Sequence, residues 1–184
     1  MTRKDGLTKV FKYFIGPVVH KEKTDLTTEV LVKALLFDDP LNDEYNQVET
    51  DFKGNPMYSK MITKLCENEN RTMMISNVIQ HELKDKKEQQ IMILAHNKSL
   101  IRDLYEKVQV FEPSVGYYLG GMKEKDLKES ETKKVIIATY AMAEEALDIK
   151  SLTSLIMATP KSDVRQAVGR ILRKKQSNAL VYDI

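Results

Sequence analysis

The sequence predicts an α/β fold of three layers, a parallel sheet covered by helices, preceded by an irregular N-terminal arm. After residue 90, short apolar runs alternate regularly with amphipathic segments. Continuous apolar strands joined by helical crossovers are typical of a parallel sheet that is buried on both faces. Before residue 90, Pro17, Pro40, Pro56 and polar loops separate segments of mixed type, which indicates the arm.

Each element predicted after residue 90 rests on length and spacing. The run at 91–95 is entirely apolar, too short for a helix and right for a buried strand. Asn97 can cap the helix that follows, in which Leu100, Leu104 and Val108 recur at helical spacing. The later elements are a strand at 115–119, a charged helix at 123–130, a strand at 135–138, a short helix at 141–146, a strand at 155–158, a helix from 163 to about 175 and a strand at 179–184.

The first 90 residues are less regular, and the predicted elements there are a helix at 7–15, a strand at 29–37 and two helices at 57–67 and 71–84. In parallel sheets, ligands bind at the carboxyl ends of the strands. The residues directly after the strands that end at 95, 119, 138 and 158 are therefore the predicted location of the chemistry.

Composition excludes several classes of protein. The 184 residues, 42% hydrophobic and 30% charged, suit one globular domain. No apolar run approaches the roughly 20 residues that span a bilayer, and no apolar signal segment follows the basic N-terminus. Cys66 is the only cysteine, so we expect no disulfide, no zinc site and an intracellular, reducing compartment.

The sequence lacks a phosphate-binding loop. The nearest approach to G-x-x-x-x-G-K-[ST] runs from Gly116 to Lys123, but Met122 stands where the lysine must be. Asp38-Asp39 and Asp43-Glu44 resemble magnesium-holding acids. Without a phosphate loop they cannot complete an ATP site, and we predict that they are loop acids.

A basic cluster lies on the helix predicted from 163. Net charge is only +2, so local clusters must carry any case for nucleic-acid binding. Gln166, Arg170 and Arg173 are four and three residues apart and share one face of this helix. Two guanidinium groups on a rigid helix can stabilise charge on a transferring γ-phosphate. Spacing alone leaves an ordinary surface helix equally open.

Four short segments follow one another along the chain in a characteristic order. The last two, 138–149 and Gln-x-x-Gly-Arg-x-x-Arg at 166–173, are similar to motifs V and VI of the superfamily 2 helicases. The run at 91–95 with His96-Asn97-Lys98-Ser99 is similar to motif IV, and Gly120-Gly121 to the glycine pair between motifs IV and V. The resemblance implies a C-terminal RecA-like domain, strongly for 90–184.

The start of the chain adds a weaker resemblance. Residues 3–7 and 14–17 look like the segment after motif III in xeroderma-type repair and transcription helicases, and in their relatives in poxviruses and other large DNA viruses. The resemblance implies that 1–20 is a remnant of the inter-lobe segment and that 21–184 is the RecA-like domain. Residues 21–90 match no known pattern.

The resemblance also implies residue roles. Arg170 and Arg173 would contact the γ-phosphate of ATP, with Gln166 holding the lobe interface. Glu145, Asp148 and Gly169 would lie near the nucleotide. The residues implied to contact nucleic acid are Thr139, His96, Asn97, Lys98, Gly120 and Gly121. No metal ligand is implied, because ATP and Mg²⁺ would be held mainly by an N-terminal lobe that this chain does not contain. Ala146 departs from the family, which has glycine there.

We therefore expect the C-terminal lobe of an ATP-dependent helicase or translocase, with DNA favoured over RNA. Its partners would be nucleic acid and the N-terminal lobe, with no membrane. If viral, it would work in the cytoplasm or nucleus of an infected cell. The alternatives are an RNA helicase lobe, a translocase that does not separate strands, and a non-catalytic binding module that kept the fold. Alone, the chain should have no ATPase activity.

Overall fold

The computed structural model describes residues 8–16, 30–85, 89–145, 149, 151–164, 168 and 179–184. Its helices are α1 (Thr8–Ile15), α2 (Asp43–Asn46), α3 (Tyr58–Glu67), α4 (Glu69–Asp85), α5 (Lys98–Gln109), α6 (Glu124–Ser130) and α7 (Tyr140–Glu145). Its strands are β1 (Val30–Ala34), β2 (Ile91–Ala95), β3 (Val115–Tyr118), β4 (Val135–Thr139), β5 (Ser154–Met157) and β6 (Ala179–Asp183).

All six strands belong to one sheet in the order β1-β6-β5-β2-β4-β3, and every pairing is parallel. The fold class predicted from the sequence is confirmed. Strand β2 lies between β4 and β5, so Leu94 is aligned with Ala138 on one side and Met157 on the other. The connection that follows β2 leads toward β3, whereas the connection that follows its neighbour β5 leads the opposite way, toward β6. Ligands of open parallel sheets bind at such a crossover reversal.

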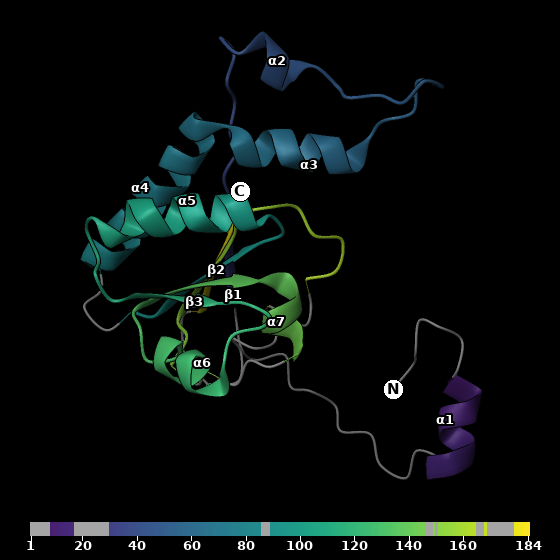
Figure 1. Cartoon of the computed structure of the whole chain (residues 1–184), viewed down its shortest axis with the longest axis vertical. Helices are drawn as coiled ribbons and strands as arrows, with labels where there is room; N and C mark the ends of the chain where they lie inside the picture. Colours follow the sequence, from purple (N-terminus) through teal and green to yellow (C-terminus); the bar gives the residue numbers. More distant parts are fainter. Residues whose placement is uncertain are drawn as a thin grey trace.

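Helices cover both faces of this sheet (Figure 1). In β2, Ile91 and Ile93 face the cluster formed with α4 and α5, while Met92 and Leu94 face the cluster formed with α6 and α7. Successive side chains of a strand point to opposite faces. A strand between two helical layers must therefore be apolar throughout, and every residue of β2 is buried.

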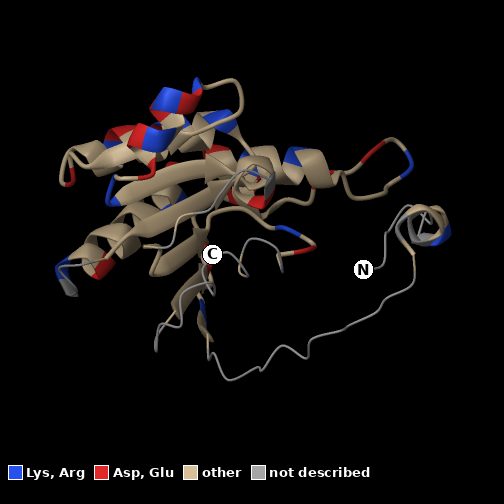
Figure 2. Ribbon diagram, turned by 90° about the horizontal axis from the view of Figure 1, so that it is seen from below, with Lys and Arg blue, Asp and Glu red and all other residues tan. Residues whose placement is uncertain are grey.

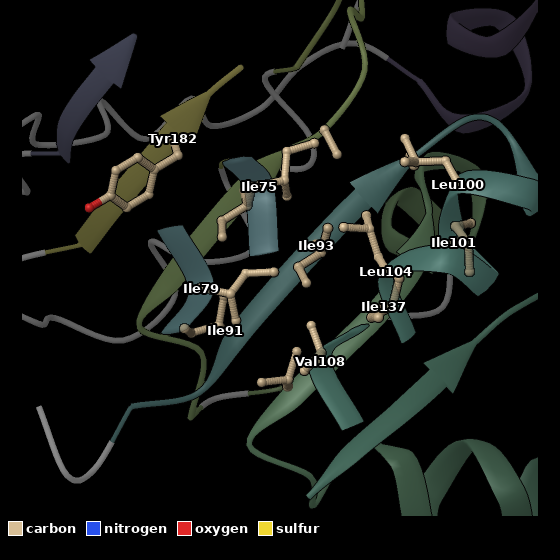
Figure 3. Packing of buried hydrophobic residues seen from close by; sticks show 14 of the residues in the cluster. Ile75, Ile79, Ile91, Ile93, Leu100, Ile101, Leu104, Val108, Ile137 and Tyr182 are labelled. Atoms are coloured by element: carbon tan, nitrogen blue, oxygen red, sulfur yellow. The ribbon is translucent and has the colours of Figure 1, made fainter. Parts of the chain in front are cut away.

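The helical layer over one face combines α4 and α5. Helix α5 buries Leu100, Ile101, Leu104 and Val108, which lie on one stripe. Figure 3 shows these side chains with Ile75 and Ile79 of α4 against β2. Both isoleucines of α4 are fully buried, so this part of the first 90 residues contributes to the core and is not a detached arm.

The remaining described residues before α3 are less regular, as predicted. Strand β1 is an edge strand, and most of its residues are exposed. A turn around Gly54, whose φ is +83°, brings Thr50 and Pro56 into an antiparallel bridge. The prediction of loop acids is partly wrong, because Asp43 and Glu44 begin the one-turn helix α2, where Asn42 caps the helix N-terminus.

Charge is segregated from the sheet (Figure 2). Strands β2, β4 and β5 carry no charged residue, and the Lys, Arg, Asp and Glu residues lie mainly on helices and loops. The helix predicted from 163 lies mostly outside the described residues. Within it, the Val168 N–H donates to the Val164 carbonyl at 2.9 Å, as in a helix. Both valines pack against the core cluster formed with α6 and α7.

Candidate nucleic-acid interface

The residues predicted to contact nucleic acid converge at one edge of the sheet. Thr139 is the last residue of β4 and is aligned with Ala95, so His96 follows directly beside it. Tyr118 is aligned with Ala138, which places Gly120 just past the neighbouring strand end. Adjacent strands lie about 4.8 Å apart. The three strand ends therefore form a row about 10 Å wide.

The loop after β2 is fixed by hydrogen bonds on both sides. The Asn97 side chain accepts from the Ser99 N–H at 2.9 Å and from the Ser99 hydroxyl at 2.8 Å, which confirms the predicted cap of α5. The His96 N–H donates to the Thr159 hydroxyl at 3.1 Å. The His96 and Lys98 side chains are exposed, so a rigid backbone presents both to solvent at a helix N-terminus, which favours anions.

Tyr140 and Thr159 support the loop after β2, and neither role was predicted from the sequence. The buried Tyr140 hydroxyl donates to the Thr159 carbonyl at 2.5 Å, and its ring lies 4.8 Å from that of His96. Burial raises the pKa of Tyr140, so the hydroxyl remains a donor at neutral pH. The Lys161 ammonium lies over this ring, 5.4 Å from its centroid, and pairs with Glu144 at 3.1 Å.

Arg71 of α4 is buried behind the same edge. Its Nη2 donates to the carbonyls of Ala158 at 2.8 Å and Ile184 at 2.6 Å. Its Nη1 has no hydrogen-bond partner among the described residues, and burial lowers the pKa of the guanidinium. A signal for this role was present in the sequence. Arg71, Ile75 and Ile79 are four residues apart and share the face of α4 that meets the core.

The two glycines after β3 differ. Gly121 has φ of +89°, a conformation that side chains rarely adopt, and closes a turn in which the Met122 N–H donates to the Leu119 carbonyl at 3.3 Å. A Cβ on Gly120 would meet only the Met142 sulfur at 3.9 Å, an ordinary contact. The structure therefore explains Gly121 by its backbone, while Gly120 has room for a side chain unless a ligand occupies it.

Most residues predicted to face ATP lie outside the described residues, namely Gln166, Gly169, Arg170, Arg173 and Asp148. Ala146 lies outside them as well. Glu145 is the last residue of α7. The described geometry therefore concerns the residues predicted to contact nucleic acid, and the contacts to the nucleotide stay a prediction.

Two further kinds of feature are absent from the described part of the chain. Within these residues, no three or more His, Cys, Asp or Glu side chains are grouped so that they could hold a metal ion. No described helix is both long and apolar enough to cross a membrane.

Solved structures share this fold. T4 UvsW matches 84% of the chain and 32% of its own length with a TM-score of 0.62 and 20% identity. The C-terminal domain of the DEAD-box protein Dbp5 matches 65% of the chain and 72% of its own length with a TM-score of 0.51 and 16% identity. At identities of 16% and 20%, these likenesses show a shared fold, the RecA-like fold that the sequence predicted.

The relatives in sequence are proteins of large DNA viruses. A protein of Acanthamoeba polyphaga mimivirus is 35% identical over 188 positions, which cover the whole chain and 36% of the relative. A protein of African swine fever virus is 32% identical over 71 residues, 38% of the chain and 14% of the relative. Both carry the provisional name of ATP-dependent RNA helicase. The chain spans about a third of the mimivirus protein, and no family model matches it.

Proposed function

We propose that the chain acts as the C-terminal lobe of an ATP-dependent helicase and binds the backbone of a single nucleic-acid strand along the row Gly120–Thr139–His96. The observation that supports this most directly is the convergence of the motif residues at one sheet edge, beside the crossover reversal. The exposed side chains of His96 and Lys98, at the N-terminus of α5, suit phosphate oxygens.

Contacts to phosphates specify position and carry little sequence information. DNA and RNA strands share this backbone charge, and we propose that the row binds both. The expectation that DNA is favoured has no support in the names of the viral relatives, which are named for RNA.

The nucleotide part of the proposal rests on Arg170 and Arg173. They would stabilise the charge on the γ-phosphate of ATP bound by a second lobe, with Gln166 at the interface. Asp148, Glu145 and Gly169 would lie near the nucleotide. In a protein that contains both lobes, Arg170→Ala or Arg173→Ala should lower the rate of phosphate release by a factor of about 10³ to 10⁵, while ATP binding changes little. Arg173→Lys should fail as well, because lysine lacks the planar fork.

The test of the strand-binding part is titration of the chain with labelled single-stranded DNA and RNA of equal length at two salt concentrations. Affinity should fall steeply with salt, because each phosphate contact releases a counterion. Lys98→Ala should weaken the binding of both DNA and RNA, and it should reduce the slope of log affinity against log salt concentration by about 1. The matched control is Lys134→Ala, at the residue before β4 and hence at the opposite edge of the sheet, which should change neither. Binding that is insensitive to salt would refute the proposal.

A further inference from the structure

A groove adjoins the predicted phosphate row, and its far wall comes from α3, in the part of the sequence that matched no known motif. It lies between Tyr58 and Ile62 of α3 and the loop His96–Lys98, and its volume is about 540 Å³. This is within the range of roughly 300 to 1,000 Å³ that small-ligand sites occupy. The hollow is therefore large enough for one nucleotide and opens beside the loop that would hold its phosphate.

Tyr58 gives this groove an aromatic wall that is held in place. Its side chain is 60% exposed although it is the first residue of a helix that packs on α4 and α5. Its hydroxyl donates to the Pro160 carbonyl at 3.4 Å. The ring is thus anchored at the α3 backbone and at its hydroxyl, and much of its surface remains open to solvent.

Charge decides which kind of occupant fits. The groove is lined by one cation, Lys98, together with hydroxyl, amide and imidazole groups, and by no acidic side chain among the described residues. A second hollow between α3, α4 and α5 is lined by one cation, Lys107, against four carboxylates, those of Glu67, Glu69, Asp103 and Glu106. A polyanion is repelled by the second hollow and accepted by the first.

We propose that this groove holds one base of the bound strand, stacked on Tyr58, while its phosphate lies at the His96–Lys98 loop. This rests on the proposed function, and it adds a contact to a base where the motifs supply contacts to the backbone. Every base offers a flat face, so stacking on an aromatic ring is tolerant of sequence. The contact would hold a strand in register without reading it.

The experiment compares binding of an oligothymidylate with that of an abasic strand of the same length and phosphate count, at one low salt concentration. The wild-type chain should bind the thymidylate about 10-fold more tightly than the abasic strand. Tyr58→Ala should remove this preference and leave affinity for the abasic strand within about 2-fold of wild type. Tyr58→Phe should keep the preference, because it removes the hydrogen bond to Pro160 but retains the ring.

Met61→Ala is the matched control, because Met61 is on the same helix and is exposed but does not line the groove. It should bind both strands as the wild type does. Equal binding of the two strands by the wild type, or equal weakening of both by Tyr58→Ala, overturns the stacking proposal and leaves the backbone row intact. Absence of salt-dependent binding to either strand overturns the proposed function and, with it, the groove.

Discussion

Replacing Ile79 by alanine tests whether α4 is part of the folded core. The side chain is fully buried in the cluster with α5 and β2, and Figure 3 shows it beside Ile91. The change deletes three carbon groups, each worth about 0.8 kcal/mol of burial, or about 2.4 kcal/mol together. A residual cavity of about 50 Å³ adds roughly 1 kcal/mol. We expect the free energy of unfolding to fall by about 3.5 kcal/mol.

The assay is urea unfolding followed by circular dichroism, where a slope near 2 kcal/mol per M converts this loss into a midpoint about 1.5 to 2 M lower. The matched control is Met73→Ala on the same helix, where the side chain is 46% exposed; it should change stability by less than about 0.5 kcal/mol. Equal stability of the two variants would refute the packing of α4 against the sheet.

Three further predictions concern Asn97, the glycine pair and Tyr118. Asn97→Ala should cost about 1 kcal/mol in urea unfolding through loss of the α5 cap, whereas Asn97→Asp should keep the cap and weaken oligonucleotide binding; equal stability of the two contradicts the cap. Gly121→Ala should lower stability by about 1 kcal/mol because its φ is positive, whereas Gly120→Ala should lower only strand affinity. Burial and the hydrogen bond to a carboxylate raise the pKa of Tyr118 to about 12. Since this pKa is raised on folding, the stability it contributes is complete below pH 10 and is lost between about pH 10 and 12. Tyr118→Phe should make alkaline unfolding shallower in that window, and an unchanged profile would count against the shift.

The described strands and helices after residue 90 agree with the sequence prediction because each is encoded locally. Five consecutive apolar residues at 91–95 suit only a strand buried on both faces, and Asn97 at the next boundary supplies the cap of α5. The order of the strands was not predictable in the same way. Nothing near Val30 indicates that it pairs with Ala179, because that pairing is chosen by the whole sheet.

Part of the candidate site could be predicted from the sequence, and part could not. Its motif residues follow strands, and strand ends of a parallel sheet meet at one edge, so their proximity could be predicted. The spacing of α4 indicates that Arg71 faces the core, but the hydrogen-bond partners of Arg71 and Tyr140 could not be predicted, because they are carbonyl groups distant in sequence, at Ala158 and Thr159. Tyr58 was missed because the hollow beside it exists only once α3 lies over the loop after β2.

The position of β6 between β5 and β1 has a consequence for biosynthesis. Strand β1 is synthesised before β6, which is its hydrogen-bonding partner in the sheet and follows it by about 150 residues. Until residue 183 has left the ribosome, β1 has no neighbour and β5 presents an open edge, and open strand edges pair with other chains. Because closure joins residues about 150 positions apart, it should also be a late and slow step of folding. A nascent chain stalled before residue 179 should therefore aggregate, or bind chaperones, more than one stalled after β6 has left the ribosome.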